Sequence, residues 1–188
     1  MKKLIYLFLL LTSVLPVFAE RWTVAPKIGL NVSDMTGSYD GRLKLGLNAG
    51  FGVECRFSTI FALETGAFYS MEGTHDYGDT RKYDYINVPV LLKAFAGKSG
   101  FNVFVGPQLG VNVMEKIVTT TGDGYQVTQK TDDILPVNFS LVFGLGYQFE
   151  SGFLVSANYN AGVVNVDEYS YNESIRHRVF QFNIGWRF

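Results

Sequence analysis

The side chains best suited to chemistry in this sequence are charged residues that interrupt apolar and glycine-rich segments. The candidate site consists of Lys27, Glu54, Arg56, Glu64, Lys93 and Arg187. Charges removed from water need partners. If the segments that carry them pair in sequence order, the lysines and glutamates of this set lie at similar depth, and we expect a Lys/Glu ladder. Such a ladder fits a network that fills a narrow interior, or alternatively a gate on an ion path.

The two histidines raise the question of catalysis. His75 precedes Asp76 in a polar stretch, and His177 lies between Arg176 and Arg178. Nucleophilic catalysis needs a nucleophile within hydrogen-bond reach of a base, and spacing alone places no serine beside His75. Neither histidine has the spacing of a metal site. We therefore expect solvated loop histidines, no catalytic residue, no metal and no cofactor.

Acidic residues gather with Gly and Thr in the polar stretches. Carboxylates and backbone oxygens bind Ca²⁺, but the regular ligand spacing of a helix-loop-helix calcium site is missing. Solvated loops are therefore expected around these residues: Asp34, Asp40, Asp76, Asp79, Asp123, Asp132, Asp133, Asp167 and Glu168.

The elements that must position the charged residues are segments in which apolar residues recur at every second position, the period of a β-strand. From Leu43 to Phe57, every odd-numbered residue is apolar and every even-numbered one is Gly, polar or charged. A slip of one residue would exchange the two faces. Similar alternation predicts strands at 22–33, 43–57, 60–73, 83–96, 101–114, 137–149, 153–165 and 180–188.

A few residues break this rule. Phe68, Leu91 and Phe104 fall on the polar face, and Thr65 falls on the apolar face. Three prolines that lack a backbone donor interrupt strands and are candidate bulges, which leaves the register open near Pro26, Pro89 and Pro107.

The connections alternate in length. Tight turns are predicted at 57–60, 97–100 and 150–152, and longer polar stretches at 34–42, 74–82, 115–134 and 166–174. This arrangement is typical of a bacterial membrane barrel with short periplasmic turns, long outer loops and both termini in the periplasm.

The start of the chain resembles an export signal. Lys2 and Lys3 precede a short apolar run, and Ala19 is a small residue suited to cleavage. The run is too short for a membrane-spanning helix, so we prefer a cleaved signal peptide at 1–19 over an uncleaved anchor, with one domain at 20–188. Cys55 is the single cysteine, which excludes an internal disulfide. A net charge of −1 argues against a nucleic-acid partner.

The two faces indicate which solvent surrounds the barrel. A soluble ligand-binding barrel points its apolar face inward, but here the other face is rich in Gly, Asn, Gln, Ser and charged residues, which make a poor core. The apolar face must therefore contact lipid, and closure satisfies the backbone without water. We predict an all-β, eight-stranded antiparallel up-and-down transmembrane barrel, present as a monomer. Aromatic belts are expected near Trp22, Phe57, Phe61, Phe101, Phe149, Phe153, Trp186 and Phe188 at the periplasmic side, and near Tyr39, Tyr69, Tyr83, Tyr169 and Tyr171 at the outside.

Two features resemble known bacterial proteins. The ending with Phe182, Gly185, Trp186 and Phe188 is similar to the C-terminal signal of outer-membrane proteins, which implies recognition by the barrel-assembly machinery. The segments 26–33, 85–93 and 143–147 resemble the small outer-membrane β-barrels called the porin family, PorT-like, of Bacteroidetes-type bacteria. The resemblance implies location in the outer membrane, among its lipids.

One connection carries a more specific pattern. The β-prone residues of 117–121 and 125–128 flank the turn signal Gly122-Asp123-Gly124, which predicts a hairpin that protrudes beyond the membrane. Its edge is a candidate for pairing with an extracellular or envelope protein by strand addition. We therefore expect a non-enzymatic structural or interaction barrel with a narrow, closed lumen. The alternative is a small-solute channel or a subunit of a transport or secretion machine.

Overall fold

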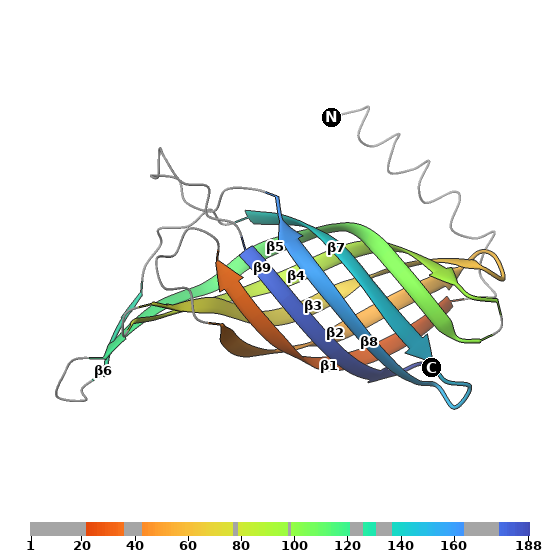
Figure 1. Cartoon of the computed structure of the whole chain (residues 1–188), viewed down its shortest axis with the longest axis horizontal. Coiled ribbons are helices and arrows are strands. Elements are labelled where there is room, and N and C mark those ends of the chain that lie inside the picture. The colour runs from red at the N-terminus through yellow and green to blue at the C-terminus, as the bar shows by residue number, and fades with distance from the viewer. Residues whose placement is uncertain are drawn as a thin grey trace.

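The computed structural model describes residues 22–35, 43–76, 79–97, 99–120, 126–130, 137–163 and 177–188. Within these ranges, no helix is long and apolar enough to cross a membrane. The chain instead forms one antiparallel sheet (Figure 1). Its strands are β1 (Trp22–Met35), β2 (Lys44–Arg56), β3 (Phe61–Asp76), β4 (Asp79–Phe95), β5 (Phe101–Thr120), β6 (Gln126–Lys130), β7 (Val137–Gln148), β8 (Phe153–Gly162) and β9 (His177–Trp186).

Eight of these strands close into a barrel. Each strand pairs with its neighbours in the order β1-β2-β3-β4-β5-β7-β8-β9, and β9 returns to pair with β1. Closure pairs the backbone groups within the sheet, which is what a strand-built membrane protein requires. The predicted eight-stranded antiparallel barrel is therefore confirmed. The fifth predicted strand also continues, as expected, into a hairpin with β6.

The two ends of the barrel differ. At one end, here called the turn end, lie the tight connections at 57–60, 96–100 and 149–152, the start of β1 and the C-terminus (Figure 1). At the opposite, loop end, the residues 36–42, 131–136 and 164–176 lie outside the described ranges, as do residues 1–21 with the predicted signal peptide.

One predicted loop is wrong. The stretch 74–82 was expected to be a long polar connection, but β3 runs to Asp76 and β4 begins at Asp79. The pairs Gly73 with Lys82 and Thr74 with Arg81 extend the ladder beyond the apolar alternation. A strand in water needs no apolar face when its backbone pairs with a neighbour, so hydrophobic periodicity does not reveal it.

The faces of the barrel are inside out relative to a soluble protein. Leu45 on β2 is 74% exposed and Phe182 on β9 is 56% exposed, whereas Asn31 and Ser70, which point inward, are fully buried. The inward positions are covered by neighbouring side chains in the lumen. The outward positions form the apolar surface that lipid must cover.

The residues that break the alternation have structural reasons. Phe68 faces Gly50 across the β2–β3 ladder, and Phe104 faces Gly144 across the β5–β7 ladder, so each ring covers a position without a side chain. Phe104 also packs with Leu91 in a small apolar cluster that Val142 completes. On the lipid side, the hydroxyl of Thr65 donates a hydrogen bond to the carbonyl of Pro89 (2.8 Å).

The bulge lies away from the prolines. Pro26 pairs with β2 and Pro107 pairs with β7, each in continuous register. Near Pro89 the β3–β4 and β4–β5 ladders are interrupted. The register shift falls between Asp84 and Tyr85, where β5 carries an extra residue. The expectation of bulges at the prolines is therefore not met.

The aromatic residues at the turn end mostly face outward. Trp22, Phe57, Phe61, Phe101, Phe149, Trp186 and Phe188 are all exposed. At the loop end, Tyr69 is exposed, but Tyr83 is 2% exposed and points into the barrel, which corrects its predicted place in the outer belt. Tyr39, Tyr169 and Tyr171 lie outside the described residues.

The apolar outer surface ends below the rim of the sheet. The outward residues of β4 are apolar from Leu92 to Ile86, and the next outward positions are Asp84 and Lys82. Beyond this boundary the ladders of β3 to β6 continue as a sheet that projects from the barrel (Figure 1). We call this part, residues 71–76, 79–84, 114–120 and 126–130, the projecting sheet.

A charge placed on the lipid face tests this boundary. Val90→Arg puts a guanidinium near the middle of the apolar surface and is expected to lower the free energy of unfolding by about 2–4 kcal/mol. Val118→Arg makes the same change on the outward side of the projecting sheet and is expected to cost about 1 kcal/mol or less. Urea unfolding from lipid vesicles, followed by tryptophan fluorescence, measures both. Equal losses would contradict a lipid-facing Val90.

The Phe104 and Gly144 pair gives a second test. A Cβ at Gly144 would lie 2.3 Å from the Phe104 ring and 2.7 Å from the Ala157 carbonyl. Gly144→Ala is therefore expected to destabilise the barrel by about 1–3 kcal/mol. Phe104→Leu in the same chain should restore part of the loss in urea unfolding. Gly146→Ala is the comparison, because its Cβ would lie 3.2 Å from the Asn102 side-chain oxygen and the Val155 carbonyl, and it should therefore lose less stability than Gly144→Ala.

Candidate functional site in the barrel lumen

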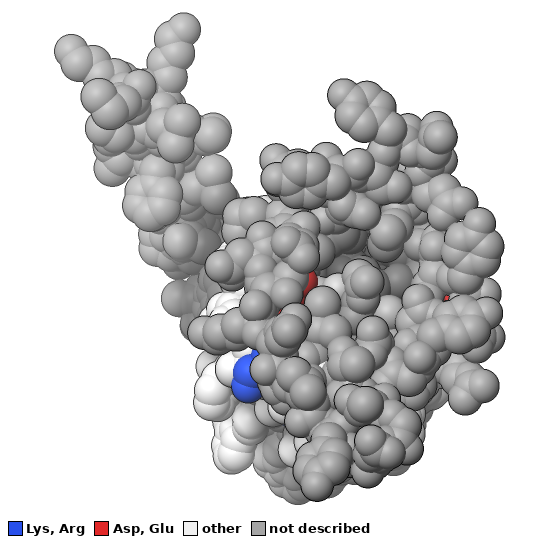
Figure 2. Space-filling view, turned by 90° about the vertical axis from the view of Figure 1, so that its left-hand side faces the viewer, with Lys and Arg blue, Asp and Glu red and all other residues white. Residues whose placement is uncertain are grey.

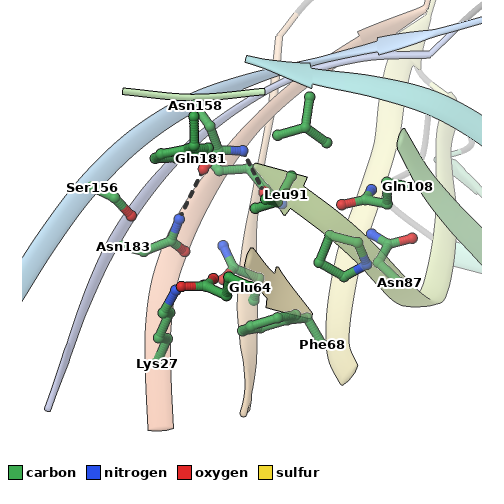
Figure 3. Close-up of a pocket in the computed structure, with 14 residues that line it drawn as sticks. Lys27, Glu64, Phe68, Asn87, Leu91, Gln108, Ser156, Asn158, Gln181 and Asn183 are labelled. Atoms are coloured by element: carbon green, nitrogen blue, oxygen red, sulfur yellow. Dashed lines mark hydrogen bonds and ion pairs between the residues drawn. The ribbon is translucent and has the colours of Figure 1, made fainter. Parts of the chain in front are cut away.

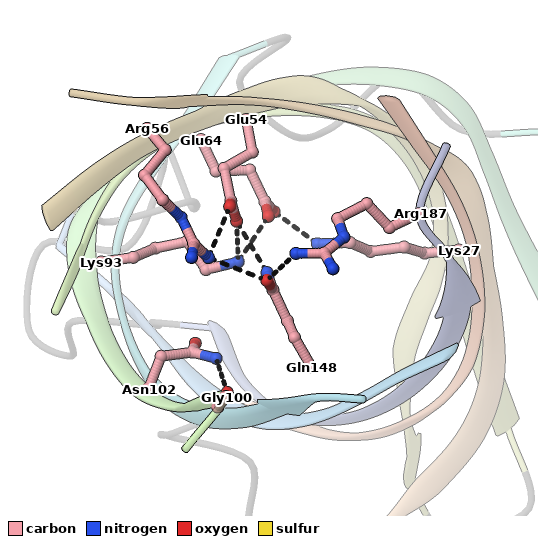
Figure 4. Close-up of polar contacts among 9 residues, drawn as sticks. All are labelled: Lys27, Glu54, Arg56, Glu64, Lys93, Gly100, Asn102, Gln148 and Arg187. Atoms are coloured by element: carbon pink, nitrogen blue, oxygen red, sulfur yellow. Dashed lines mark hydrogen bonds and ion pairs between the residues drawn. The ribbon is translucent and has the colours of Figure 1, made fainter. Parts of the chain in front are cut away.

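The lumen near the turn end is crossed by an ion-pair network centred on Glu64 of β3 (Figure 4). Lys27 of β1 places its Nζ 2.5 Å from Glu64 Oε1, and Lys93 of β4 places its Nζ 2.8 Å from Glu64 Oε2. All three side chains are at most 10% exposed. One carboxylate therefore holds two lysines that approach from opposite sides.

Glu54 of β2 extends the network. Lys93 donates to Glu54 Oε2 (2.8 Å), and Arg56 lies 3.3 Å from Glu54 Oε1. Glu54 and Glu64 are direct cross-strand partners, an arrangement in which like charges repel. Lys93, which bridges both carboxylates, offsets that repulsion.

Gln148 of β7 joins the network from the other side of the lumen. Its Nε2 donates to Glu54 Oε2 (2.8 Å), and its Oε1 accepts from Arg56 (3.0 Å) and Arg187 (2.8 Å). The structure thus brings all six sequence-predicted charged residues into one connected set through this amide. We call Gln148 with these six residues the ionic layer.

Gln148 was missed by sequence reasoning. It lies on the inward face of its strand, where Asn, Ser and Gly also occur, and nothing in its spacing distinguishes it. Its role depends on where Arg56 and Arg187 meet, which the register of non-neighbouring strands decides.

The local sequence explains how Lys27 reaches Glu64. The two residues lie on β1 and β3, with β2 between them. Lys27 pairs with Gly50 and Glu64 pairs with Glu54, and Gly52 is the inward-facing residue between those two positions of β2. A Cβ at Gly52 would lie 3.3 Å from both Glu64 Oε1 and Lys27 Cε. The glycine thus leaves room for the ion pair to pass over β2.

A second polar layer fills the lumen toward the loop end. Its side chains donate hydrogen bonds in sequence, from Asn183 to Asn158, then to Gln181, which donates to Asn31, then to Ser70 and finally to the carboxyl group of Glu72. Apart from Glu72 these side chains are uncharged, and we call the set the amide layer. Individual distances run from 2.9 to 3.1 Å. Glu72 also accepts from Asn87 (3.2 Å), and its backbone carbonyl accepts from Lys44 (2.7 Å).

Little space remains between these layers. A cavity of about 50 Å³ is lined by Lys27 and Glu64 together with Asn158, Gln181 and Asn183 (Figure 3). A second cavity of about 20 Å³ adjoins Lys93 and Asn102. A water molecule occupies about 30 Å³ in the liquid, so these spaces suit single waters rather than solutes.

The two histidines do not lie in the loops expected for them. The backbones of His75 and His177 lie in β3 and β9, and their side chains are outside what the structure describes. Within the described residues, no three His, Cys, Asp or Glu side chains gather as a metal site would require. Seen from the loop end, described side chains of both charge signs are visible at the surface (Figure 2).

The residues of the predicted assembly signal close the barrel. Phe182 and Trp186 of β9 point outward and are exposed, and the backbone of Phe188 exchanges hydrogen bonds with Val24. A Cβ at Gly185 would lie 2.5 Å from the Pro26 carbonyl, so only glycine fits there without a shift of the backbone. The ending therefore holds β9 against β1.

Solved structures share this architecture. The chain is similar to Ail, the attachment invasion locus protein of Yersinia pestis, with a TM-score of 0.53 and 13% sequence identity, over 89% of this chain and 99% of that one. It is also similar to Neisserial surface protein A, with a TM-score of 0.55 and 13% identity, over 89% of this chain and 97% of that one. At such identities the likeness shows the fold alone. No curated protein sequence matches the chain.

The family is shown by a match along most of the sequence. Residues 16–168 match the model described as outer membrane protein beta-barrel domain. This match agrees with the closed antiparallel barrel, the lipid-facing apolar surface and the polar lumen. The chain is therefore a member of the outer membrane β-barrel domain family, and its location is the bacterial outer membrane.

Proposed function

We propose that the protein is a non-enzymatic barrel with a closed lumen, which acts through its loop end on an extracellular or envelope protein. The observation that carries the closed lumen is the ionic layer, in which Gln148 of β7 joins Arg56 of β2 and Arg187, the residue after β9. Side chains from opposite walls thus meet in the middle of the barrel.

The dimensions of the barrel support this proposal. An eight-stranded barrel has an interior just wide enough for side chains. Here that interior contains the ionic layer, the amide layer and the apolar cluster around Phe104, with cavities of about 50 and 20 Å³ between them. A nutrient molecule would have to displace several buried ion pairs to pass.

The projecting sheet supports the interaction role. In the proposed orientation the turn end, with the start of β1 and the C-terminus, faces the periplasm. β6, which pairs with β5, then stands outside the cell. An exposed strand edge offers unpaired backbone groups to another chain. Ail carries attachment in its name, and we extend an attachment role to this chain as part of the proposal.

Three further parts of the proposal concern the chain before and after insertion. Residues 1–19 act as a cleaved signal peptide, and residues 20–188 form the barrel. The barrel-assembly machinery reads the strand that ends at Phe188, and the inserted protein is a monomer. We assign it to the PorT-like group of Bacteroidetes-type barrels on the segments 26–33, 85–93 and 143–147.

Conductance tests the closed lumen. The pure protein in a planar lipid bilayer is expected to show no sustained openings. Lys93→Ala combined with Glu54→Ala removes one buried ion pair of the ionic layer and shortens both side chains. The Lys27–Glu64 pair and the contacts of both arginines with Gln148 remain. We expect that variant to conduct measurably more often than the wild type.

Glu150→Ala is the matched control for that experiment, because Glu150 lies on the exposed turn between β7 and β8. It should stay as silent as the wild type. A large, stable conductance of the wild-type protein would contradict the closed lumen and favour a small-solute channel.

Deletion tests the interaction role. Replacing residues 117–130 by a short Gly-Ser turn removes β6 and the end of β5 but leaves the barrel strands. Liposomes that carry this variant are expected to adhere to envelope fractions and to cells no better than empty liposomes. The control replaces residues 166–174 in another connection, and gel mobility with and without heating verifies that both barrels are folded. Undiminished adherence of the 117–130 variant would exclude the projecting sheet as the binding element.

A further inference from the structure

The turn end of the lumen opens into a cavity of about 590 Å³ that neither the closed lumen nor the projecting sheet explains. Its inner wall includes Arg56, Gln148 and Arg187. Its rim includes Gly97, Ser99 and Gly100 of one turn and the residues 149–151 of another. Ligand sites in proteins commonly have volumes of roughly 300–1,000 Å³. The cavity is therefore of the right size for a small molecule or a headgroup.

Two guanidinium groups converge at the base of this cavity. Arg56 and Arg187 both donate to the same atom, Gln148 Oε1, at 3.0 and 2.8 Å (Figure 4). Two like charges thus share one neutral acceptor. Their repulsion in a partly dehydrated mouth is unfavourable unless a negative group lies nearby.

The carboxylates of the ionic layer are already used. Glu64 pairs with Lys27 and Lys93, and Glu54 pairs with Lys93 and Arg56. Four cations in this layer thus face two carboxylates. Within the described residues, Arg187 has no carboxylate at ion-pair distance, so the excess positive charge is at the mouth.

The acidic group at the rim does not neutralise this charge directly. Glu150 lines the cavity but lies on the exposed turn, and among the described residues it forms no ion pair with either arginine. The guanidinium group of Arg56 packs on the Phe95 ring, with its central carbon 3.8 Å from the ring centre. The Arg56 side chain remains 31% exposed. The ring fixes one face of the guanidinium and leaves N–H groups directed at the cavity.

We propose that this mouth binds a phosphate-type oxyanion between Arg56 and Arg187. Planar guanidinium groups donate pairs of hydrogen bonds to phosphate oxygens and bind them more tightly than a lysine would. The oxyanion comes either from free phosphate in the surrounding water or from the phosphate of a lipid headgroup in the adjacent leaflet. Gln148 positions both arginines and supplies no charge of its own.

The test is a titration of the full barrel in a non-ionic, phosphate-free detergent at low salt. Inorganic phosphate is added while the side-chain N–H signals of Arg56 and Arg187 are followed by NMR. A second arm adds phosphatidylglycerol in place of free phosphate. Saturable shifts in the first arm identify free phosphate as the ligand, and saturable shifts in the second arm alone identify the headgroup.

Variants decide whether the shifts come from this site. Arg187→Gln is expected to weaken binding at least about tenfold, as seen in the remaining Arg56 signal, and Arg187→Lys should weaken it less because the charge remains. Arg178→Gln, at the loop end of the same strand, is the control and should bind as the wild type does. Unsaturable shifts in both arms, or equal binding by wild type and Arg187→Gln, would overturn the proposal.

Discussion

Charge compensation inside a narrow lumen is the constraint on which the rest of this structure depends. Glu64 carries a buried negative charge, and an uncompensated charge in that position would be strongly unfavourable. Lys27 of β1 and Lys93 of β4 compensate the charge of Glu64. Gly52 leaves the space for the contact with Lys27, and Gln148 connects the network to β7 on the far wall. Each of these residues is understandable only in relation to the others.

The outer surface and the lumen impose opposite demands on the same strands. Lipid requires a continuous apolar face, while the interior must contain groups that satisfy one another without bulk water. Alternation meets both demands, because successive residues of a strand face the lipid and the lumen in turn. A lumen filled in this way leaves little room for side chains to vary, which is why the proposed partner binding is assigned to the projecting sheet and the proposed oxyanion site to the mouth at the turn end.

Much of the fold could be predicted from the sequence, because side-chain alternation follows directly from strand geometry. The strands and the two faces were accessible by this reasoning. The extension of β3 to Asp76 and the start of β4 at Asp79 were not, because strands beyond the lipid lack the apolar signal. Tyr83 was misplaced for a different reason: alternation puts it on the same inward face as Lys93, and only its aromatic type suggested the outer belt. Within the site, alternation places Lys27 and Glu64 on the inner face, but only the closed barrel shows that they meet across β2 and that Gln148 joins the arginines.

The coupling between Lys27 and Glu64 tests the central claim most directly. Unfolding free energies of the wild type, Lys27→Met, Glu64→Gln and the double variant form a double-mutant cycle. The account predicts that the two single changes are not additive, with an interaction energy of about 1–3 kcal/mol favouring the native pair. Additivity within about 0.5 kcal/mol would mean that lumen water already compensates these charges, and it would contradict the ionic layer as the stabilising centre of the barrel.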